Sequence, residues 1–204
     1  MSNIKMKKCY FCKETAVHEC AVCRKPLCQA HTRILPVCHA CTPKIYVEFS
    51  IAEKTENDSQ KIEELTRIFW GETEQVTFDI KLEIHKLPAY IAESNGELIG
   101  FIAYKPLEKS MLIAALAVLP KYQGAGVGKA LIQKVEEKAR QLSKRKLLVS
   151  TSNDDLPALA FYQKFGFQIF EVKPNIIAEK HGKVIPGIDG IPVRDEIRLH
   201  KTLS

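Results

Sequence analysis

The sequence predicts a small metal-binding module followed by a mixed α/β domain, in which helices flank a sheet. Three observations support this division. All seven cysteines lie between Cys9 and Cys41 of the 204-residue chain. After them, segments with the two-residue alternation of strands take turns with segments of helical periodicity. The length also fits one ordinary domain of about 100 to 200 residues plus a small module. We therefore expect domains at 1–45 and 46–204.

The cysteine-rich segment has the spacing of a two-metal site. A two-residue gap lets both side chains of a pair reach one ion, and eight soft ligands fit two tetrahedral Zn²⁺ ions. A segment of about 45 residues also buries too little apolar surface to fold unaided, so metal would supply folding energy. The spacing alone leaves open which pairs share an ion. The pairs are Cys9 and Cys12, Cys20 and Cys23, Cys28 and His31, and Cys38 and Cys41.

The charge of this segment argues against nucleic acid as a partner. Residues 1–45 hold eight Lys or Arg and two Glu, a formal charge of +6, while the other 159 residues are balanced at 22 basic and 22 acidic side chains. Seven thiolates and two Zn²⁺ ions would reduce the +6 to about +3. No base-reading helix motif accompanies that small excess. We expect the module to bind a protein partner or to stabilise the domain that follows.

The chain lacks the apolar segments that export or membrane insertion would use. Its first eight residues carry charge without an apolar stretch, which excludes a secretory signal there and disfavours a disulfide framework for the cysteines. The longest apolar run, Met111–Pro120, has half the length of a membrane-spanning helix. We expect a cytoplasmic protein without a membrane partner.

The second domain begins with a strand and an amphipathic helix. The segment "YVEFSIAE" (46–53) alternates like a strand, and Asn57–Ser59 can cap a helix over 60–70. The segment 72–87 has no clear pattern. The apolar residues that we expect on one face of the helix are Ile62, Leu65, Ile68 and Phe69.

A three-strand meander follows. Strands over 89–94 and 97–106 flank Asn95-Gly96, a dipeptide that favours a two-residue hairpin turn. The apolar run 111–120 predicts a buried strand.

The remainder of the chain alternates helices and strands. We expect helices up to about Leu142 and over 154–166, the second ending at Gly166. Strands are expected over 146–152, 167–172 and 191–203. The inward side chains expected in the first of these helices are Val127, Ala130, Leu131, Val135 and Leu142.

The glycine-rich loop "KYQGAGVGKA" (121–130) between a buried strand and a helix predicts an anion site. Unpaired amides and the positive end of the helix dipole face such a ligand, and glycine lets it approach closely. The Gly-x-Gly-x-Gly spacing departs from the dinucleotide fingerprint. A Walker A loop would need glycine in place of Gln123 and a hydroxyl in place of Ala130.

Three motifs resemble the GNAT acetyltransferases. Gln123-x2-Gly126-x-Gly128 is similar to the family's Gln/Arg-x-x-Gly-x-Gly/Ala signature, and "TSNDDLPALAFYQKFGF" (151–167) resembles its Asn-x-x-Ala-x-x-Phe-Tyr segment. The ending "IPGIDGIPVRDEIRLHKTL" resembles one subfamily. The resemblance covers about 46–204 and implies a strongly twisted mixed sheet. It also implies an acetyl-CoA-dependent N-acetyltransferase whose acceptor is an amine of a small molecule or a protein.

The resemblance assigns roles to individual residues. Backbone N–H groups around Ala117 and Val118 would polarise the thioester carbonyl, and Asn153 would contact CoA. Tyr162 would lie near the sulfur and protonate the leaving thiolate. The pyrophosphate would be held by Gln123, Gly124, Ala125, Gly126, Val127, Gly128 and Lys129.

The base that deprotonates the amine is not where many members of the family carry it, because Met111–Pro120 contains no acid. Among the alternatives we favour Asp195 and Glu196, since paired acids can attract an ammonium group. The other hypothesis is an adaptor that binds acyl-CoA without catalysis and uses the zinc module to bind a protein. The remaining candidate bases are Glu83, His85 and Glu93.

The cysteine-rich segment resembles the B-box and related cross-brace zinc fingers, in which the first and third ligand pairs share one ion. This resemblance implies two sites. One would consist of Cys9, Cys12, Cys28 and His31, and the other of Cys20, Cys23, Cys38 and Cys41.

Overall fold

The computed structural model describes residues 7–10, 12–16, 18–19, 25–28 and 47–203. The chain divides into two compact units, Met1–Lys44 and Ile45–Ser204. In the first unit, β1 (His18–Glu19) pairs antiparallel with β2 (Pro26–Leu27). The predicted ligands outside the described residues are Cys20, Cys23, His31, Cys38 and Cys41.

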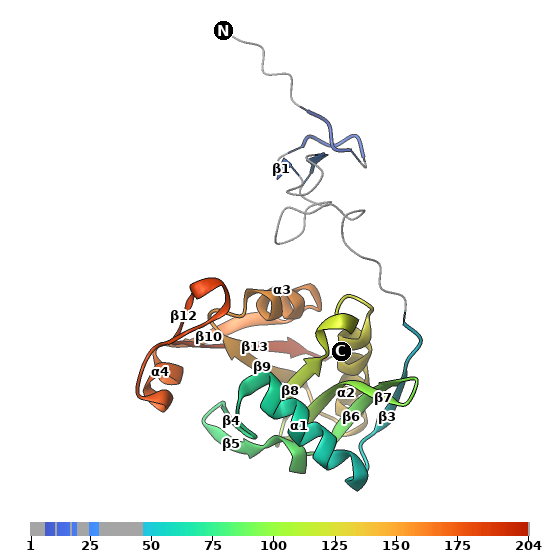
Figure 1. Ribbon diagram of the computed structural model, residues 1–204, viewed down its shortest axis with the longest axis vertical. Helices are drawn as coiled ribbons and strands as arrows, with labels where there is room; N and C mark the ends of the chain where they lie inside the picture. Colours follow the sequence, from blue (N-terminus) through green and yellow to red (C-terminus); the bar gives the residue numbers. More distant parts are fainter. Residues whose placement is uncertain (1–6, 11, 17, 20–24, 29–46, 204) are drawn as a thin grey trace. The chain divides into compact units, whose positions relative to one another are not determined.

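The second unit is built on a seven-stranded mixed sheet with the order β10-β13-β9-β8-β7-β6-β3 (Figure 1). Only β8 and β9 run parallel, and every other pair of neighbours is antiparallel. The mixed α/β class predicted from the sequence is confirmed. The strands are β3 (Ser50–Glu53), β6 (Ala89–Ser94), β7 (Glu97–Pro106), β8 (Ser110–Val118), β9 (Lys146–Ser152), β10 (Gln168–Lys173) and β13 (Glu196–Thr202).

Helices cover both faces of this sheet. Alternate residues of β7 point to opposite faces, so Phe101 packs with Ile62 of α1, while Ile102 packs with Leu131 of α2 and Tyr162 of α3. Each fully buried Ile, Leu or Phe stabilises the fold by about 1.5 to 3 kcal/mol. The helices are α1 (Ser59–Trp70), α2 (Val127–Gln141), α3 (Leu156–Lys164) and α4 (Ile176–His181), and the short 3₁₀ turns are Glu56–Asp58, Ile84–Lys86, Pro120–Tyr122 and Ile188–Gly190.

The helix predictions are corrected at two side chains. Ile68 is 73% exposed, because it lies outside the stripe that Ile62 and Leu65 define on α1. Thr66 is buried there instead, and its hydroxyl donates to the carbonyl of Ile62. Leu142 is 45% exposed because α2 ends one residue before it.

Three segments differ from the strand predictions. The unassigned stretch 72–87 forms a hairpin of β4 (Glu74–Thr77) and β5 (Ile80–Glu83). The predicted last strand is split, because β12 (Pro192–Val193) pairs with β11 (Ile185–Pro186) before β13 begins. The first strand begins only at Ser50. Among the described residues, the helices lack the length and apolar character that a membrane crossing requires.

Candidate active site

The site begins where two parallel strands separate. The ladder between β8 and β9 pairs only three residues of each strand, and its last pair is Leu112 with Leu148. Beyond this pair β8 continues to Val118, still paired with β7, and β9 continues to Ser152. The two strands therefore diverge towards their carboxyl ends, where the sheet of an α/β protein commonly receives a ligand.

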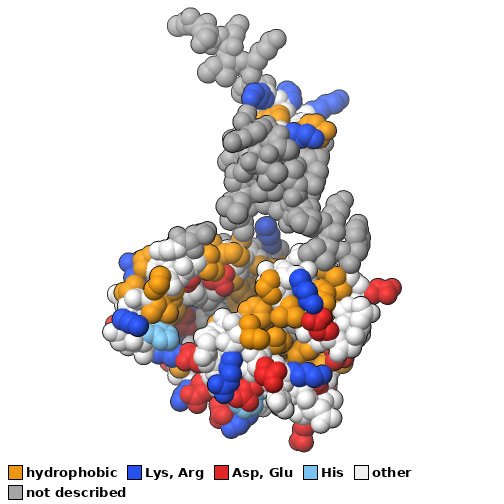
Figure 2. Space-filling model, viewed as in Figure 1, with side chains coloured by type: hydrophobic (Ala, Val, Ile, Leu, Met, Phe, Trp, Pro, Cys, Tyr) orange, Lys and Arg blue, Asp and Glu red, His pale blue; other side chains and the backbone are white. Residues whose placement is uncertain are grey.

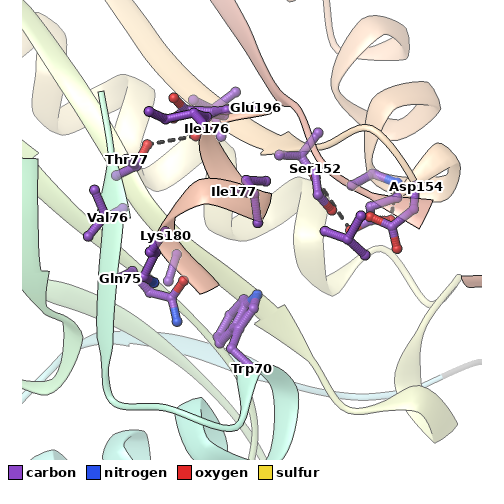
Figure 3. A pocket seen from close by; sticks show the side chains of 18 of the residues that line it. Trp70, Gln75, Val76, Thr77, Ser152, Asp154, Ile176, Ile177, Lys180 and Glu196 are labelled. Carbon is purple, nitrogen blue, oxygen red and sulfur yellow. Dashed lines mark hydrogen bonds between the residues drawn. The ribbon is translucent and has the colours of Figure 1, made fainter. Parts of the chain in front are cut away.

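A cavity of about 490 Å³ opens at this divergence. Residues 113–116 of β8 and 149–152 of β9 form its base, and its walls come from the end of α1, the hairpin strand β4, the start of α3 and helix α4. Figure 2 shows this face with hydrophobic side chains gathered around a hollow. In Figure 3, Gln75 and Val76 lie on the left and Asp154 on the right, and Ile176 and Ile177 lie between them.

The predicted anion loop joins β8 to α2, and its glycines have separate structural roles. Gly124 and Gly126 adopt positive φ angles of 86° and 91°, and a Cβ at either position would meet no atom within 4 Å. Gly126 is the N-cap of α2, whose first N–H groups have no acceptor within the helix. A Cβ on Gly128 would lie 3.2 Å from Cζ of Phe161, so this glycine lets α2 pack closely on α3.

Gln123 ties the loop to the end of β8. Its side-chain amide donates to the carbonyl of Val118 at 3.0 Å, and Lys121 forms an ion pair with Glu97 at 3.0 Å. Ala117 is 2% exposed, and the cavity touches β8 at residues 113–116, before Ala117 and Val118.

Tyr162 of α3 lines the cavity and is 6% exposed. Its ring packs edge-on against Phe161 and Phe167, with centroids 5.5 Å apart in both pairs. Burial, followed by the negative charge of Asp155, raises the pKa of the Tyr162 hydroxyl far above its ordinary value of 10.0. The phenol therefore stays protonated at neutral pH, as a proton donor must.

Asn153 lies at the end of β9 and uses its side chain to hold the backbone before β13. Its amide nitrogen donates to the carbonyl of Pro192 at 2.9 Å, and its oxygen accepts from the N–H groups of Arg194 and Asp195 at 2.9 Å each. These bonds fix the position of both predicted acids.

The two acids have different surroundings. Glu196 is 6% exposed and lines the cavity, where one carboxylate oxygen accepts from the N–H of Phe78 and the other from Arg198 at 2.8 and 2.9 Å. Asp195 is not part of the cavity lining, and it accepts from the N–H of Asn175, which precedes α4. The other candidate bases lie outside the cavity lining; they are Glu83, His85 and Glu93.

Arg198 connects Glu196 to the β4–β5 hairpin. The arginine is buried, and it also pairs with Asp79 and Glu171 at 3.0 Å. Its guanidinium lies 4.8 Å from the ring centroid of Phe78. Phe78 and Asp79 both have positive φ, and these contacts hold them in that conformation.

Asp154 and Asp155 also line the cavity, although neither was among the predicted site residues. Asp154 is 5% exposed, and one of its oxygens, Oδ1, has no hydrogen-bond partner. Asp155 caps α3 by accepting from the N–H of Ala158 at 3.0 Å. Burial, with a further contribution from the charge of Asp154, raises the pKa of Asp155 above 3.8.

This raised pKa predicts the effect of Asp155→Asn on stability. A carboxyl with a raised folded-state pKa favours folding at low pH, and that contribution is lost as pH rises from 3.8 through the folded-state value. Because Asn caps helices as well as Asp, the variant should have a higher Tm than wild type at pH 7, and the two should converge in acid.

Asp58→Asn is the matched comparison with the opposite sign. Hydrogen bonds from Thr55 lower the pKa of Asp58, so this variant should be less stable than wild type at pH 7. Thermal unfolding between about pH 4 and pH 8 measures both differences. A destabilised Asp155→Asn protein at pH 7 would contradict the expectation.

In the first unit, three of the predicted metal ligands lie together. The Sγ atoms of Cys9, Cys12 and Cys28 are within 4.8 Å of one another. The Cys12–Cys28 separation of 3.6 Å is far longer than a disulfide bond of about 2.05 Å. Three thiols at this spacing are suited to one tetrahedral ion that takes a fourth ligand.

Comparison with known proteins identifies relatives of the second unit. Residues 56–167 match the sequence profile of the Acetyltransferase (GNAT) family. The chain is 35% identical over 141 residues to the uncharacterised protein YdhI of Bacillus subtilis, covering 66% of this chain and 86% of the relative.

Two solved structures share the fold. One is an IAA acetyltransferase from Bacillus cereus, with a TM-score of 0.59 and 27% identity over 76% of this chain and 100% of that one. The other is a GNAT family acetyltransferase from Elizabethkingia anophelis with acetyl-CoA bound, with a TM-score of 0.57 and 25% identity over 76% and 98% of the two chains.

Proposed function

The chain belongs to the GNAT family of acetyltransferases, and from this premise we propose that it transfers the acetyl group of acetyl-CoA to an amine of a small molecule or a protein. The divergence of β8 from β9 carries the proposal. It opens the sheet beside Tyr162, and the glycine loop at the start of α2 follows the same strand β8.

The loop supports binding of the pyrophosphate. Gly124 and Gly126 leave open space where side chains would stand, and the first amides of α2 point out of the helix end. We assign the pyrophosphate to residues 123–129 and the thioester carbonyl to the backbone around Ala117 and Val118. Asn153 would contribute to cofactor binding indirectly. Its side chain holds the backbone of residues 192–194, and this segment would lie beside the cofactor.

The reaction needs a proton donor for the departing thiolate. The amine attacks the acetyl carbonyl, the carbon–sulfur bond breaks, and the thiolate of CoA takes the proton of the Tyr162 hydroxyl. Burial keeps that hydroxyl protonated until the thiolate develops.

On the acceptor side, Glu196 has the better position of the two favoured acids. It lines the cavity, whereas Asp195 holds the backbone before α4. We therefore propose that Glu196 takes part in deprotonating the amine and that Asp195 positions the segment over the cavity.

A transfer assay tests this function. The full chain would be incubated with acetyl-CoA and a panel of amines, and release of CoA would be followed together with the mass of each product. We expect a mass increase of one acetyl group on at least one amine. Binding of acetyl-CoA without transfer to any amine would contradict the enzymatic proposal.

That second outcome would favour an adaptor that binds acyl-CoA. Two observations keep this alternative in view: residues 111–120 carry no acid, and both carboxylate oxygens of Glu196 already have partners. In an adaptor, the zinc module would bind a protein partner.

We also propose that residues 1–45 form a cross-brace module with two Zn²⁺ ions. Cys9, Cys12 and Cys28 belong to the first and third ligand pairs, and their proximity is what a cross-brace requires. In a sequential arrangement, the first and second ligand pairs would share one ion and the third and fourth pairs the other. Cys28 would then bind a different ion from Cys9 and Cys12. Zinc would supply folding energy to a module too small for a sufficient apolar core.

Zinc stoichiometry in two double variants tests the arrangement. Wild type should hold two Zn²⁺ per chain. In the cross-brace, Cys9→Ser with Cys28→Ser damages one site and should leave one ion, whereas Cys9→Ser with Cys20→Ser damages both sites and should leave none. Metal analysis of purified protein measures this. The reverse result would establish the sequential arrangement.

A further inference from the structure

We propose that Asp154 binds the amino group of the acceptor, and that the acceptor is a small primary amine with an apolar body. The proposal rests on the acetyltransferase function proposed above and assigns a substrate class to it. It depends on an unpartnered buried oxygen, on the contacts that fix its direction, and on the composition of the cavity walls.

The first observation is the state of the Asp154 carboxylate. The residue is 5% exposed and lines the cavity, and Oδ2 accepts from the N–H of Ile188 at 3.0 Å. Oδ1 is buried and has no partner. Burying a carboxylate oxygen without a hydrogen-bond donor costs free energy. A ligand with an N–H group would donate the hydrogen bond that Oδ1 lacks.

The second observation is that Asp154 is held in place. A Cβ added to Gly187 would lie 2.2 Å from Oδ2 of Asp154, so the backbone of the β11–β12 hairpin passes directly against the carboxylate. Together with the bond from Ile188, this contact fixes the orientation of Oδ1 before any ligand arrives.

Among the described residues, no cationic side chain forms an ion pair with Asp154. The other acids of the lining have partners. Glu72 pairs with Lys180, whereas Glu196 and Asp79 both pair with Arg198. Asp155 accepts from the N–H of Ala158 and from the hydroxyl of Thr151. The basic side chains of the lining are Lys180 and His181, both on α4. The cavity therefore favours a positively charged or N–H-donating ligand at Asp154.

The walls indicate what the amine is attached to. Trp70 lines the cavity from the end of α1, and Ile176 and Ile177 line it from α4 (Figure 3). The cavity has a volume of about 490 Å³, which the amine would share with the acetyl end of acetyl-CoA. An ion pair of 2.5 Å between Lys180 and Glu72 holds α4 against the segment after α1. These features suit an arylalkylamine or branched alkylamine better than a polycation or an extended peptide.

The test compares phenethylamine with spermidine and with a short peptide that has a free amino terminus. Wild type should acetylate phenethylamine with the highest kcat/KM of the three. Asp154→Asn should raise the KM for phenethylamine about tenfold, because the amide oxygen can still accept from Ile188 while an NH₂ group replaces Oδ1.

Gly187→Ala should raise the same KM, because its Cβ displaces the carboxylate. Glu53→Gln, which changes an exposed acid on β3, should leave the KM at the wild-type value. An unchanged KM in both cavity variants would overturn the role of Asp154, and preference for spermidine or the peptide would overturn the substrate class.

A binding measurement separates this inference from the proposed function. Phenethylamine should raise the Tm of the CoA complex of wild type, and at the same concentration it should raise that of Asp154→Asn by less. If no amine is acetylated while this difference holds, the enzymatic proposal fails and the amine site stands. If neither wild type nor the variant responds, the amine site is overturned.

Discussion

Tyr162→Phe should lower kcat about 100-fold or more while changing the Kd for acetyl-CoA by less than about twofold. A positioned general acid contributes about 10² to 10⁴ in rate. Phenylalanine keeps the ring that packs against Phe161 and Phe167, so the fold and the cofactor site should be preserved. The loss should therefore appear in turnover, where the thiolate departs without its proton.

Tyr104→Phe is the matched control. Tyr104 is another buried tyrosine, 5% exposed on β7, where its ring stacks on Tyr90 outside the cavity lining. Removing its hydroxyl should leave kcat at the wild-type value. Steady-state kinetics with saturating amine and calorimetric titration of acetyl-CoA measure the two effects. A Tyr162→Phe enzyme with wild-type turnover would remove the proton-donor role.

Local sequence signals predicted the elements whose conformation depends on neighbouring residues. The Asn95-Gly96 turn is the clearest case, because both residues adopt the positive φ angles that this dipeptide favours, 51° and 76°. The strand over 146–152 was predicted with its observed bounds, because a run of apolar and β-branched residues ends at turn-forming residues.

The β4–β5 hairpin shows why other elements were missed. Its turn residues, Phe78 and Asp79, both adopt positive φ, a conformation that a bulky residue such as Phe78 rarely takes. The conformation is held by Glu196 and Arg198, more than a hundred residues further along the chain. A contact of that kind leaves no periodic signal in the sequence.

The site divides in the same way. The family motif directed attention to Tyr162, which the structure places in the cavity wall. The sequence carries no comparable signal for Asp154, because its unpartnered oxygen exists only once Gly187 and Ile188 have folded against its other side. The carboxylate pair at 195 and 196 looks symmetrical in sequence, yet Glu196 begins β13 and is buried, whereas Asp195 precedes the strand and accepts from the N–H of Asn175 before α4.

Gly126→Asp should abolish the stabilisation that we expect acetyl-CoA to give to the wild-type protein. A ligand at about 100 times its Kd stabilises the folded state by about 2.7 kcal/mol, which corresponds to a rise in Tm of roughly 5 to 10 °C for a domain of this size. The substitution places a negative charge at the N-cap of α2, in the open space that we assign to the pyrophosphate. Repulsion and steric overlap should prevent binding there.

Gly166→Asp separates loss of the ligand from general damage to the fold. Gly166 follows α3 with a φ of 84°, close to the 91° of Gly126, so both variants carry a similar backbone strain of about 1 kcal/mol and the same added charge. Both should therefore have a lower Tm without ligand, but only Gly126→Asp should lose the shift with acetyl-CoA. A full shift in Gly126→Asp would refute the assignment of the pyrophosphate to this loop. Loss of the shift in both variants would show that the shared strain and charge remove binding even away from the loop.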